Sequence, residues 1–224
     1  MFPMPLTRKV YIGDHGVLGV WKIEETVEEL LSQIRFSNGD KETFERFKNK
    51  SRQAHWLSYR LAIRRLLGDP KELEFYYDEH GKLHFKNEEY NLSVSHSGDY
   101  AAVIINHNHC VGIDIEKLSD RINNVSLKFL SVEELIKVDE NNNKQLTCLW
   151  SAKEALYKLY GKGELVFDKN IIVEPCDVES ESGNFRGWII KDDFKKEYLL
   201  KYFFIEDYVL VYTVEGMQQG VKQV

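Results

Sequence analysis

Alternating apolar and polar positions, together with β-branched runs, predict a series of short strands along the first half of the chain. A helical pattern runs from Glu42 to Leu67 with a break near residues 49–51, and Gly68 follows as a stop signal. A shorter helix is expected at Val27–Ile34. The predicted strands are Val10–Ile12, Val17–Ile23, Leu73–Tyr77, Tyr90–Ser95, Tyr100–Asn106 and Val111–Glu116.

The second half of the chain repeats this order of elements without repeating the sequence. We expect helices at Val125–Val138 and Lys144–Tyr160, and then four strands at Leu165–Val173, Phe185–Ile190, Tyr198–Ile205 and Tyr208–Val214. Helices followed by antiparallel hairpins, twice over, predict an α+β protein of two pseudo-symmetric lobes, each with helices packed on a small, mainly antiparallel sheet. The expected boundaries are 1–109 for the N-terminal lobe, 110–216 for the C-terminal lobe and 217–224 for a tail.

Composition and charge narrow the class of protein. Among 224 residues, 43% are apolar, and 12 Phe, 12 Tyr and 4 Trp supply ample surface for a core, which excludes disorder as the main state. No apolar run approaches the roughly 20 residues that a membrane span needs, and no signal peptide is evident. Three widely spaced cysteines suit a reducing compartment. We therefore expect a cytoplasmic protein with no membrane association.

A net charge of −6 argues against general nucleic-acid binding, so any anion site must be local. One stretch between residues 46 and 65 has no acidic residue. Its basic residues are Arg46, Lys48, Lys50, Arg52, Arg60, Arg64 and Arg65. A solvated helical face is the simpler interpretation of such a run, and a local anion site is the alternative.

Two acidic residues mark the segment Val111-Gly-Ile-Asp-Ile-Glu-Lys117. On a strand, Asp114 and Glu116 are two positions apart and point to the same face, whereas Ile113 and Ile115 point to the other. Adjacent carboxylates repel each other, and a hard divalent cation would offset that repulsion. An exposed sheet face with ordinary acidic residues is equally consistent with this segment alone.

Hydroxyl, acidic and basic residues share one stripe of the helix that ends at Gly161: Thr147, Ser151, Glu154 and Lys158. Glu154 and Lys158 alone would be an ordinary surface pair. A third segment, Ser95-His96-Ser97-Gly98, follows an apolar strand. Hydroxyls, an imidazole and a glycine suit phosphate binding, but for this segment alone a hairpin turn is the simpler interpretation.

Taken together, the three segments resemble the surfactin-type 4′-phosphopantetheinyl transferases. The family pattern reads S-H-S/T, G-I-D-I/V-E, F-S-x-x-E and W-x-x-K-E-A/S-x-x-K. In this chain the matching segments are Ser95–Ser97, Gly112–Glu116, Phe129–Leu135 and Trp150–Lys158, followed by Gly161-Lys-Gly163. An upstream Gly81-Lys82 matches the family's G-K-P, with Leu83 in place of proline.

The resemblance implies a two-lobed enzyme that transfers phosphopantetheine from coenzyme A to a serine of an apo carrier protein and releases adenosine 3′,5′-bisphosphate. Asp114, Glu116 and Glu154 match the ligands of Mg²⁺, for which Mn²⁺ could substitute. Glu154 is the expected base, directly or through a water, and Lys158 would neutralise or protonate the leaving phosphate, so the catalytic set is Glu154, Lys158 and Asp114.

The resemblance also implies contacts with coenzyme A. His96 matches the histidine that meets the 3′-phosphate, with Ser95 beside it, and Lys153 matches a further lysine of the last motif. In the N-terminal lobe, Arg60 resembles an arginine of the family's coenzyme-binding helix. Arg52 is a weaker match, because the spacing there is one residue looser, and Lys82 fits a phosphate-facing lysine after Gly81 although the proline of the G-K-P motif is missing.

Two alternatives remain open at this point. One is another divalent-metal-dependent phosphotransfer or hydrolytic enzyme, although a nuclease should carry a longer basic groove. The other is a non-catalytic relative that binds coenzyme A or carrier proteins. The sequence names neither the carrier nor its pathway, and a pseudo-dimer within one chain predicts a monomer.

Overall fold

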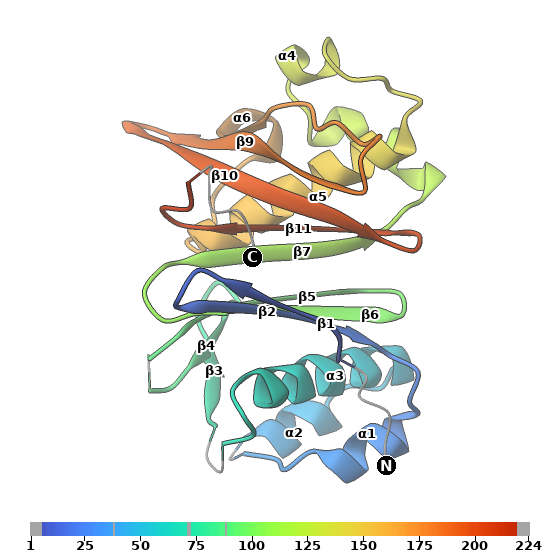
Figure 1. Ribbon diagram of the computed structural model, residues 1–224, viewed down its shortest axis with the longest axis vertical. Helices are drawn as coiled ribbons and strands as arrows, with labels where there is room; N and C mark the ends of the chain where they lie inside the picture. Colours follow the sequence, from blue (N-terminus) through green and yellow to red (C-terminus); the bar gives the residue numbers. More distant parts are fainter. Residues whose placement is uncertain (1–5, 38, 71–72, 88, 219–224) are drawn as a thin grey trace. The chain divides into compact units, whose positions relative to one another are not determined.

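The computed structural model describes residues 6–37, 39–70, 73–87 and 89–218. The chain divides into two compact units, Met1–Asn108 and His109–Val224. Both units combine helices with antiparallel sheets, and the predicted α+β class is confirmed (Figure 1). No helix in the described part of the chain is long and apolar enough to cross a membrane.

The first unit is built on a four-stranded sheet in the order β1-β2-β6-β5, in which every neighbouring pair is antiparallel. Its strands are β1 (Leu6–Ile12), β2 (Gly16–Lys22), β5 (Asn91–Ser97) and β6 (Tyr100–Asn106). A separate antiparallel hairpin joins β3 (Phe75–Tyr77) to β4 (Leu83–Phe85).

Three helices accompany this sheet: α1 (Val27–Gln33), α2 (Asp40–Glu45) and α3 (Lys50–Leu66). The expected break near residues 49–51 lies at the start of α3, where the Asn49 side chain accepts a hydrogen bond from the Arg52 N–H and caps the helix. The long helix α3 lies along one face of the sheet (Figure 1). Trp56, Leu57 and Ile63 of α3 are among the buried residues of this unit's core.

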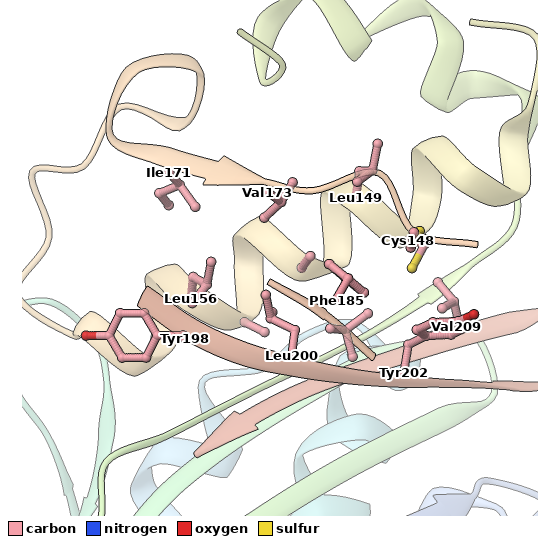
Figure 2. Close-up of a cluster of buried hydrophobic side chains, with 14 of the residues drawn as sticks. Cys148, Leu149, Leu156, Ile171, Val173, Phe185, Tyr198, Leu200, Tyr202 and Val209 are labelled. Atoms are coloured by element: carbon pink, nitrogen blue, oxygen red, sulfur yellow. The ribbon is translucent and has the colours of Figure 1, made fainter. Parts of the chain in front are cut away.

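The second unit contains a five-stranded antiparallel sheet in the order β7-β11-β10-β9-β8. The strands are β7 (Val111–Lys117), β8 (Ile171–Val173), β9 (Ser182–Lys191), β10 (Phe194–Ile205) and β11 (Tyr208–Val214). The 18-residue helix α5 (Asn143–Tyr160) packs on this sheet. Leu149 and Leu156 of α5 meet Val173, Leu200 and neighbouring apolar side chains in the core of the unit (Figure 2).

Two predicted elements of the second unit are wrong. In place of one helix over residues 125–138, there are a 3₁₀ turn, η2 (Ser126–Lys128), and a short helix, α4 (Val132–Leu135). A further 3₁₀ turn, η1 (Asp120–Asn124), precedes them. Helix α4 begins anew because Ser131 and Glu134 form a capping box.

The second error concerns the expected strand at residues 165–173, only the end of which is a strand. Residues Phe167–Asn170 form one helical turn, α6, before β8 begins. The side chain of Phe167 stacks on Trp150 with ring centroids 5.5 Å apart. This apolar run therefore packs against a distant helix, a contact that its local pattern did not predict.

Candidate functional site

The backbone of α5 approaches β7 unusually closely at Gly112. A Cβ atom at this position would lie 1.9 Å from the carbonyl oxygen of Ala155, so only glycine allows the contact. Side chains two positions apart on a strand share a face, and Asp114 and Glu116 therefore lie on the face of β7 that α5 covers. In the sequence, Gly112 stood out only as part of the Gly112–Glu116 motif. The structure explains why glycine lies two positions before Asp114, since this position must leave room for the backbone of α5.

Asp114 is buried, with 3% of its surface exposed, and Glu116 is half-buried. The interpretation of this strand as an exposed face with ordinary acidic residues is therefore wrong. In the sheet, Asp114 is paired with Val211 and Glu116 with Val209, and both valines belong to the hydrophobic core under α5. Ile113 and Ile115 are fully buried on the opposite face of the strand.

Lys158 of α5 forms an ion pair with Asp114, with 2.7 Å between Nζ and Oδ1. The Lys158 side chain is 27% exposed. Residues 114 and 158 are far apart in the sequence, and the tertiary structure joins them. The simple surface pair between Glu154 and Lys158 is therefore not the arrangement in the structure.

Glu154 lies one helical turn before Lys158 and is half-buried. Burial raises the pKa of its carboxyl to about 7, and the negative charge of Asp114 adds to this effect. Lys158 opposes the rise, whereas Glu116 contributes to it. Asp114, Glu116 and Glu154 thus influence one another electrostatically, and one cation, Lys158, acts against their repulsion.

The chemistry of these residues fits a hard divalent cation. Three carboxylates supply the oxygen ligands that Mg²⁺ prefers, and Mg²⁺ commonly takes one or two of them with substrate phosphate oxygens. Ser151 lies one turn before Glu154, and its buried hydroxyl has no hydrogen-bond partner in the described part of the chain. Among the described residues, however, no three His, Cys, Asp or Glu side chains are arranged closely enough to hold a metal by themselves. Phosphate oxygens would have to complete the shell.

Lys153 does not face a phosphate-binding surface. Its side chain is fully buried, and Nζ lies 2.7 Å from Glu134 Oε2 while donating to the carbonyl oxygens of Phe167 and Ile171. The expected contact between Lys153 and coenzyme A is therefore wrong, because every donor direction of the ammonium group has a partner inside the protein.

Glu134 is a structural residue that the sequence did not single out. Besides pairing with Lys153, it accepts hydrogen bonds from the backbone N–H groups of Ser131 and Val173. It therefore ties α4, α5 and β8 together. The S-x-x-E spacing of its capping box was the signal that could have identified it.

Arg60 is also buried, with 3% of its surface exposed. Its guanidinium pairs with Asp40 at 3.3 Å and lies over the ring of Phe75, 4.0 Å from the centroid. Unlike Lys153, Arg60 does not have a partner for every donor, because its Nε and Nη1 atoms have no hydrogen-bond partner among the described residues. Its burial and its pairing with Asp40 nevertheless argue against the expected contact with coenzyme A. Arg52, in contrast, is exposed and lies over the ring of Phe47.

His96 is an exposed residue of β5, and Ser95 beside it is buried. The ring of His96 stacks on that of His55 from α3, with centroids 4.3 Å apart and planes inclined by 8°. His55 was not among the predicted site residues. Its position three residues after Arg52, on the same face of α3, could have drawn attention to it.

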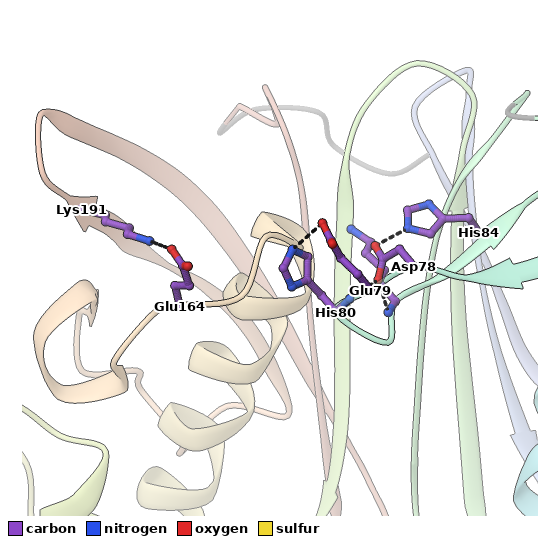
Figure 3. Close-up of polar contacts among 7 residues, drawn as sticks. Asp78, Glu79, His80, His84, Glu164 and Lys191 are labelled. Atoms are coloured by element: carbon purple, nitrogen blue, oxygen red, sulfur yellow. Dashed lines mark hydrogen bonds and ion pairs between the residues drawn. The ribbon is translucent and has the colours of Figure 1, made fainter.

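Lys82 follows the turn between β3 and β4. The Asp78 side chain organises this turn by accepting hydrogen bonds from the backbone N–H groups of His80 and Lys82 and from His84 Nε2 (Figure 3). Burial raises the pKa of Asp78, but these hydrogen bonds outweigh that effect and lower it. Leu83, in place of the family's proline, has a buried side chain. The turn is thus fixed without proline.

A cavity of about 580 Å³ lies in the second unit beside the end of α5. Its lining includes Cys110, Tyr160, Lys162 and Lys196. At its rim Lys191 pairs with Glu164 at 2.7 Å (Figure 3). Lys196 likewise pairs with Glu215, so these two lysines are already neutralised.

The family comparison agrees with the motifs. Residues 110–213 match the model of the 4′-phosphopantetheinyl transferase superfamily. Over these residues the chain is similar to this superfamily, in agreement with the resemblance drawn from the motifs.

Two relatives are similar over a longer part of the chain. A protein of Synechocystis sp., whose name assigns it provisionally to the 4′-phosphopantetheinyl transferases, is 29% identical over 150 residues, which are 61% of this chain and 59% of the relative. A 4′-phosphopantetheinyl transferase of Aneurinibacillus migulanus is 30% identical over 154 residues, or 63% of this chain and 64% of the relative. The chain thus spans less than two thirds of the length of either relative in these matches.

Proposed function

We propose that this chain transfers the 4′-phosphopantetheine group of coenzyme A to a serine of an apo carrier protein and releases adenosine 3′,5′-bisphosphate. The superfamily match over residues 110–213 supports a reaction of this class. The single structural observation that carries the proposal is the ion pair of Lys158 with the buried Asp114 beside Glu154, whose pKa is raised to about 7.

Asp114, Glu116 and Glu154 would hold Mg²⁺, or Mn²⁺ in its place. The ion would supply positive charge against the oxygens of the coenzyme pyrophosphate when bound.

Glu154 is suited to accept the proton of the carrier serine, directly or through a water. Without metal the pKa of Glu154 is about 7, and a bound cation would lower it and so favour the carboxylate form that accepts a proton. The serine oxygen would form a bond to the phosphorus that carries pantetheine. The bond from that phosphorus to the oxygen of the departing nucleotide would break, and the electron pair would stay on the nucleotide's phosphate.

Lys158 would stabilise the negative charge that develops on this leaving phosphate. Its ion pair with Asp114 holds the ammonium group in place before substrate binds, which spares the cost of ordering a long, flexible side chain. In the first unit, Ser95, His96, Arg52 and Lys82 remain the residues that we assign to coenzyme A. Lys153 and Arg60 have no part in the proposal.

The test is incubation of the protein with coenzyme A, Mg²⁺ and a panel of apo carrier proteins, followed by intact-mass measurement of each carrier. Addition of one phosphopantetheine per carrier, located on its serine and abolished by excess chelator, is the expected result. Full activity in chelator would contradict the metal assignment. Binding of coenzyme A without modification of any carrier would favour the non-catalytic alternative.

The remaining alternative, another metal-dependent phosphotransfer enzyme, predicts no metal-dependent affinity for coenzyme A. Isothermal titration of coenzyme A with and without Mg²⁺ separates it from the transferase. We also propose a monomer that acts in the cytoplasm, which size-exclusion chromatography and cell fractionation test.

A further inference from the structure

Two histidines from distant parts of the first unit form a flat stack. His55 lies in the first half of α3, and His96 lies near the end of β5. Their ring centroids are 4.3 Å apart, and the planes are inclined by only 8°. His96 is exposed and His55 is half-buried, so the pair lies at the surface with His55 on the inner side.

The orientation of His55 is fixed by a hydrogen bond. Its Nε2 lies 2.7 Å from the carbonyl oxygen of Gly98. Because a carbonyl oxygen only accepts, Nε2 carries the proton and donates it. The His55 ring is therefore held both by its helix and by the turn that follows β5.

That turn is itself held in place. Gly98 and Asp99 connect β5 to β6 between the paired residues Ser97 and Tyr100. Gly98 has a φ of +52°, which favours glycine in a tight hairpin loop. The carbonyl oxygen of Asp99 accepts a hydrogen bond of 2.7 Å from the backbone N–H of Ile23. The carbonyl to which His55 donates thus belongs to an anchored loop.

Positive charge is available beside the pair. Arg52 is exposed and lies three residues before His55, on the same face of α3. The side chains of this surface, an arginine and two imidazoles, suit a phosphate monoester, whose two negative charges favour cationic and N–H donors. The residues between 46 and 65 include no acidic side chain that would weaken this attraction.

We propose that His55 is a positioning residue that holds the His96 ring in the orientation in which it meets the 3′-phosphate of coenzyme A. The inference rests on the proposed function, in which His96 meets the 3′-phosphate of coenzyme A. His55 holds the His96 ring in one orientation and so reduces the conformational freedom lost on binding. When His96 is protonated against the phosphate, the face of the His55 ring lies against the resulting cation and stabilises it.

The alternative for His55 is a purely structural role, in which it only connects α3 to the β5–β6 turn. In that case, its substitution would lower the stability of the fold and would change the affinities for coenzyme A and dephospho-coenzyme A equally. A positioning residue would affect only the ligand that carries the 3′-phosphate. The experiment therefore compares coenzyme A with dephospho-coenzyme A, which lacks this group.

The dissociation constants of both ligands are measured by isothermal titration for wild type, His55→Ala, His55→Phe, His96→Ala and a control, His107→Ala. His107 is another histidine of the same unit that contacts an aromatic ring: its ring centroid lies 4.2 Å from that of Tyr90, with the two planes tilted by 52°. We expect wild type to prefer coenzyme A by on the order of tenfold or more, since a hydrogen bond to a charged group is lost with the 3′-phosphate. His96→Ala should remove most of this preference and His107→Ala should keep it.

His55→Ala should reduce the preference for coenzyme A over dephospho-coenzyme A at least about threefold, because the His96 side chain is no longer ordered before the ligand binds. The affinity for dephospho-coenzyme A should be unchanged. His55→Phe keeps a flat ring but lacks the donor to Gly98, so its preference should fall between those of wild type and His55→Ala. If His55→Ala fails to fold, His55→Phe carries the same comparison. An unchanged preference in the folded variant, or an equal loss for both ligands, would overturn the proposal.

Failure of the proposed function gives a different result. The same comparison with adenosine 3′,5′-bisphosphate and adenosine 5′-monophosphate needs no carrier and no transfer. If no carrier is modified but the preference for the 3′-phosphate depends on His55, the transferase proposal fails and this inference stands. If carriers are modified while His55→Ala retains the full preference, only this inference fails.

Discussion

Nζ of Lys158 lies 2.7 Å from Oδ1 of Asp114, so the lysine at the end of α5 is bound to a buried carboxylate of β7. This pair connects two motifs that are separated by more than forty residues. It also shows why Glu154 and Lys158 should not be treated as a surface pair of one helix. Lys158 is held beside a group of carboxylates, where a fixed positive charge has a chemical use.

The first prediction concerns Lys158. Replacement by alanine should lower turnover on the order of 10²-fold or more, since the variant loses the cation that stabilises the leaving phosphate. Lys117→Ala is the matched control, because Lys117 is an exposed lysine of β7 paired with Asp207. Steady-state transfer to a carrier protein measures both, and the control should stay close to wild type.

Lys158→Arg tests how the lysine acts. Arginine keeps the charge, but its pKa is too high for it to donate a proton readily. Partial rescue of turnover would indicate electrostatic stabilisation, and no rescue would indicate proton donation or strict geometry. Turnover within about threefold of wild type in Lys158→Ala would contradict the catalytic role, because proton-transfer and electrostatic contributions are far larger.

The second prediction follows from the pKa of Glu154, which rises from 4.5 to about 7 in the folded protein. Between these values the unfolded chain releases a proton that the folded protein retains. The free energy of unfolding of the metal-free protein should therefore fall as pH rises through this interval. Below 4.5 the carboxyl is protonated in both states, and this component of stability is fully present.

Glu154→Gln removes this component, because glutamine does not titrate. Urea unfolding in excess chelator at several pH values between 4.5 and 8 checks the prediction. The difference in stability between Glu154→Gln and wild type should grow with pH, whereas Glu45→Gln, at an exposed position of α2, should follow wild type. Parallel curves for wild type and Glu154→Gln would contradict the raised pKa.

The third prediction concerns the buried pair of Lys153 and Glu134. Lys153→Met should destabilise the protein by about 3–5 kcal/mol, since it leaves the Glu134 charge buried without its cation. The double variant Lys153→Met/Glu134→Gln should cost less, because glutamine is neutral and leaves no buried charge without a partner. Its single oxygen keeps only one of the two hydrogen bonds that the Glu134 oxygens accept from the Ser131 and Val173 N–H groups.

Chemical denaturation measures the stability of these variants, and coenzyme A titration measures their binding. The affinity of the folded double variant for coenzyme A should equal that of wild type. If the Lys153→Met protein is stable but binds coenzyme A more weakly than wild type, the result would support a contact between Lys153 and phosphate and contradict this prediction.

The fourth prediction concerns Gly112. Its replacement by alanine would bring a methyl group within 1.9 Å of the Ala155 carbonyl oxygen, so α5 and β7 must move apart. We expect a loss of about 1–3 kcal/mol or more in stability, as for overpacking in cores, and reduced turnover as Asp114 separates from Lys158.

Gly187→Ala is the control for this prediction. The three atoms nearest to its new methyl group belong to side chains, with Leu156 and Leu200 at 2.8 Å, and rotation of these side chains relieves the contacts in part. The denaturant midpoint should therefore fall further in Gly112→Ala than in Gly187→Ala. The reverse order would show that α5 adjusts easily over β7.

Much of the local structure followed from the sequence because side-chain periodicity is a local property. Tyr100–Asn106 and Tyr208–Val214 were predicted with the bounds that the structure has, and α5 begins one residue before the predicted start. The period of two also predicted that Asp114 and Glu116 share a face. The resemblance to the superfamily followed from the order and spacing of motifs.

The tertiary structure decided what those side chains meet. Lys153 and Lys158 are five residues apart, about 140° around a helix, so one helix directs them to different surroundings. The sequence did not reveal that Glu134 binds the first and Asp114 the second, because these partners come from other elements. Likewise, Arg60 belonged to a basic run that suggested an anion site, but folding buries it against Asp40. Burial and long-range pairing depend on how helices and strands pack against one another. This packing distinguishes Lys158, a catalytic candidate, from Lys153 and Arg60, whose charges are paired in the interior of their units.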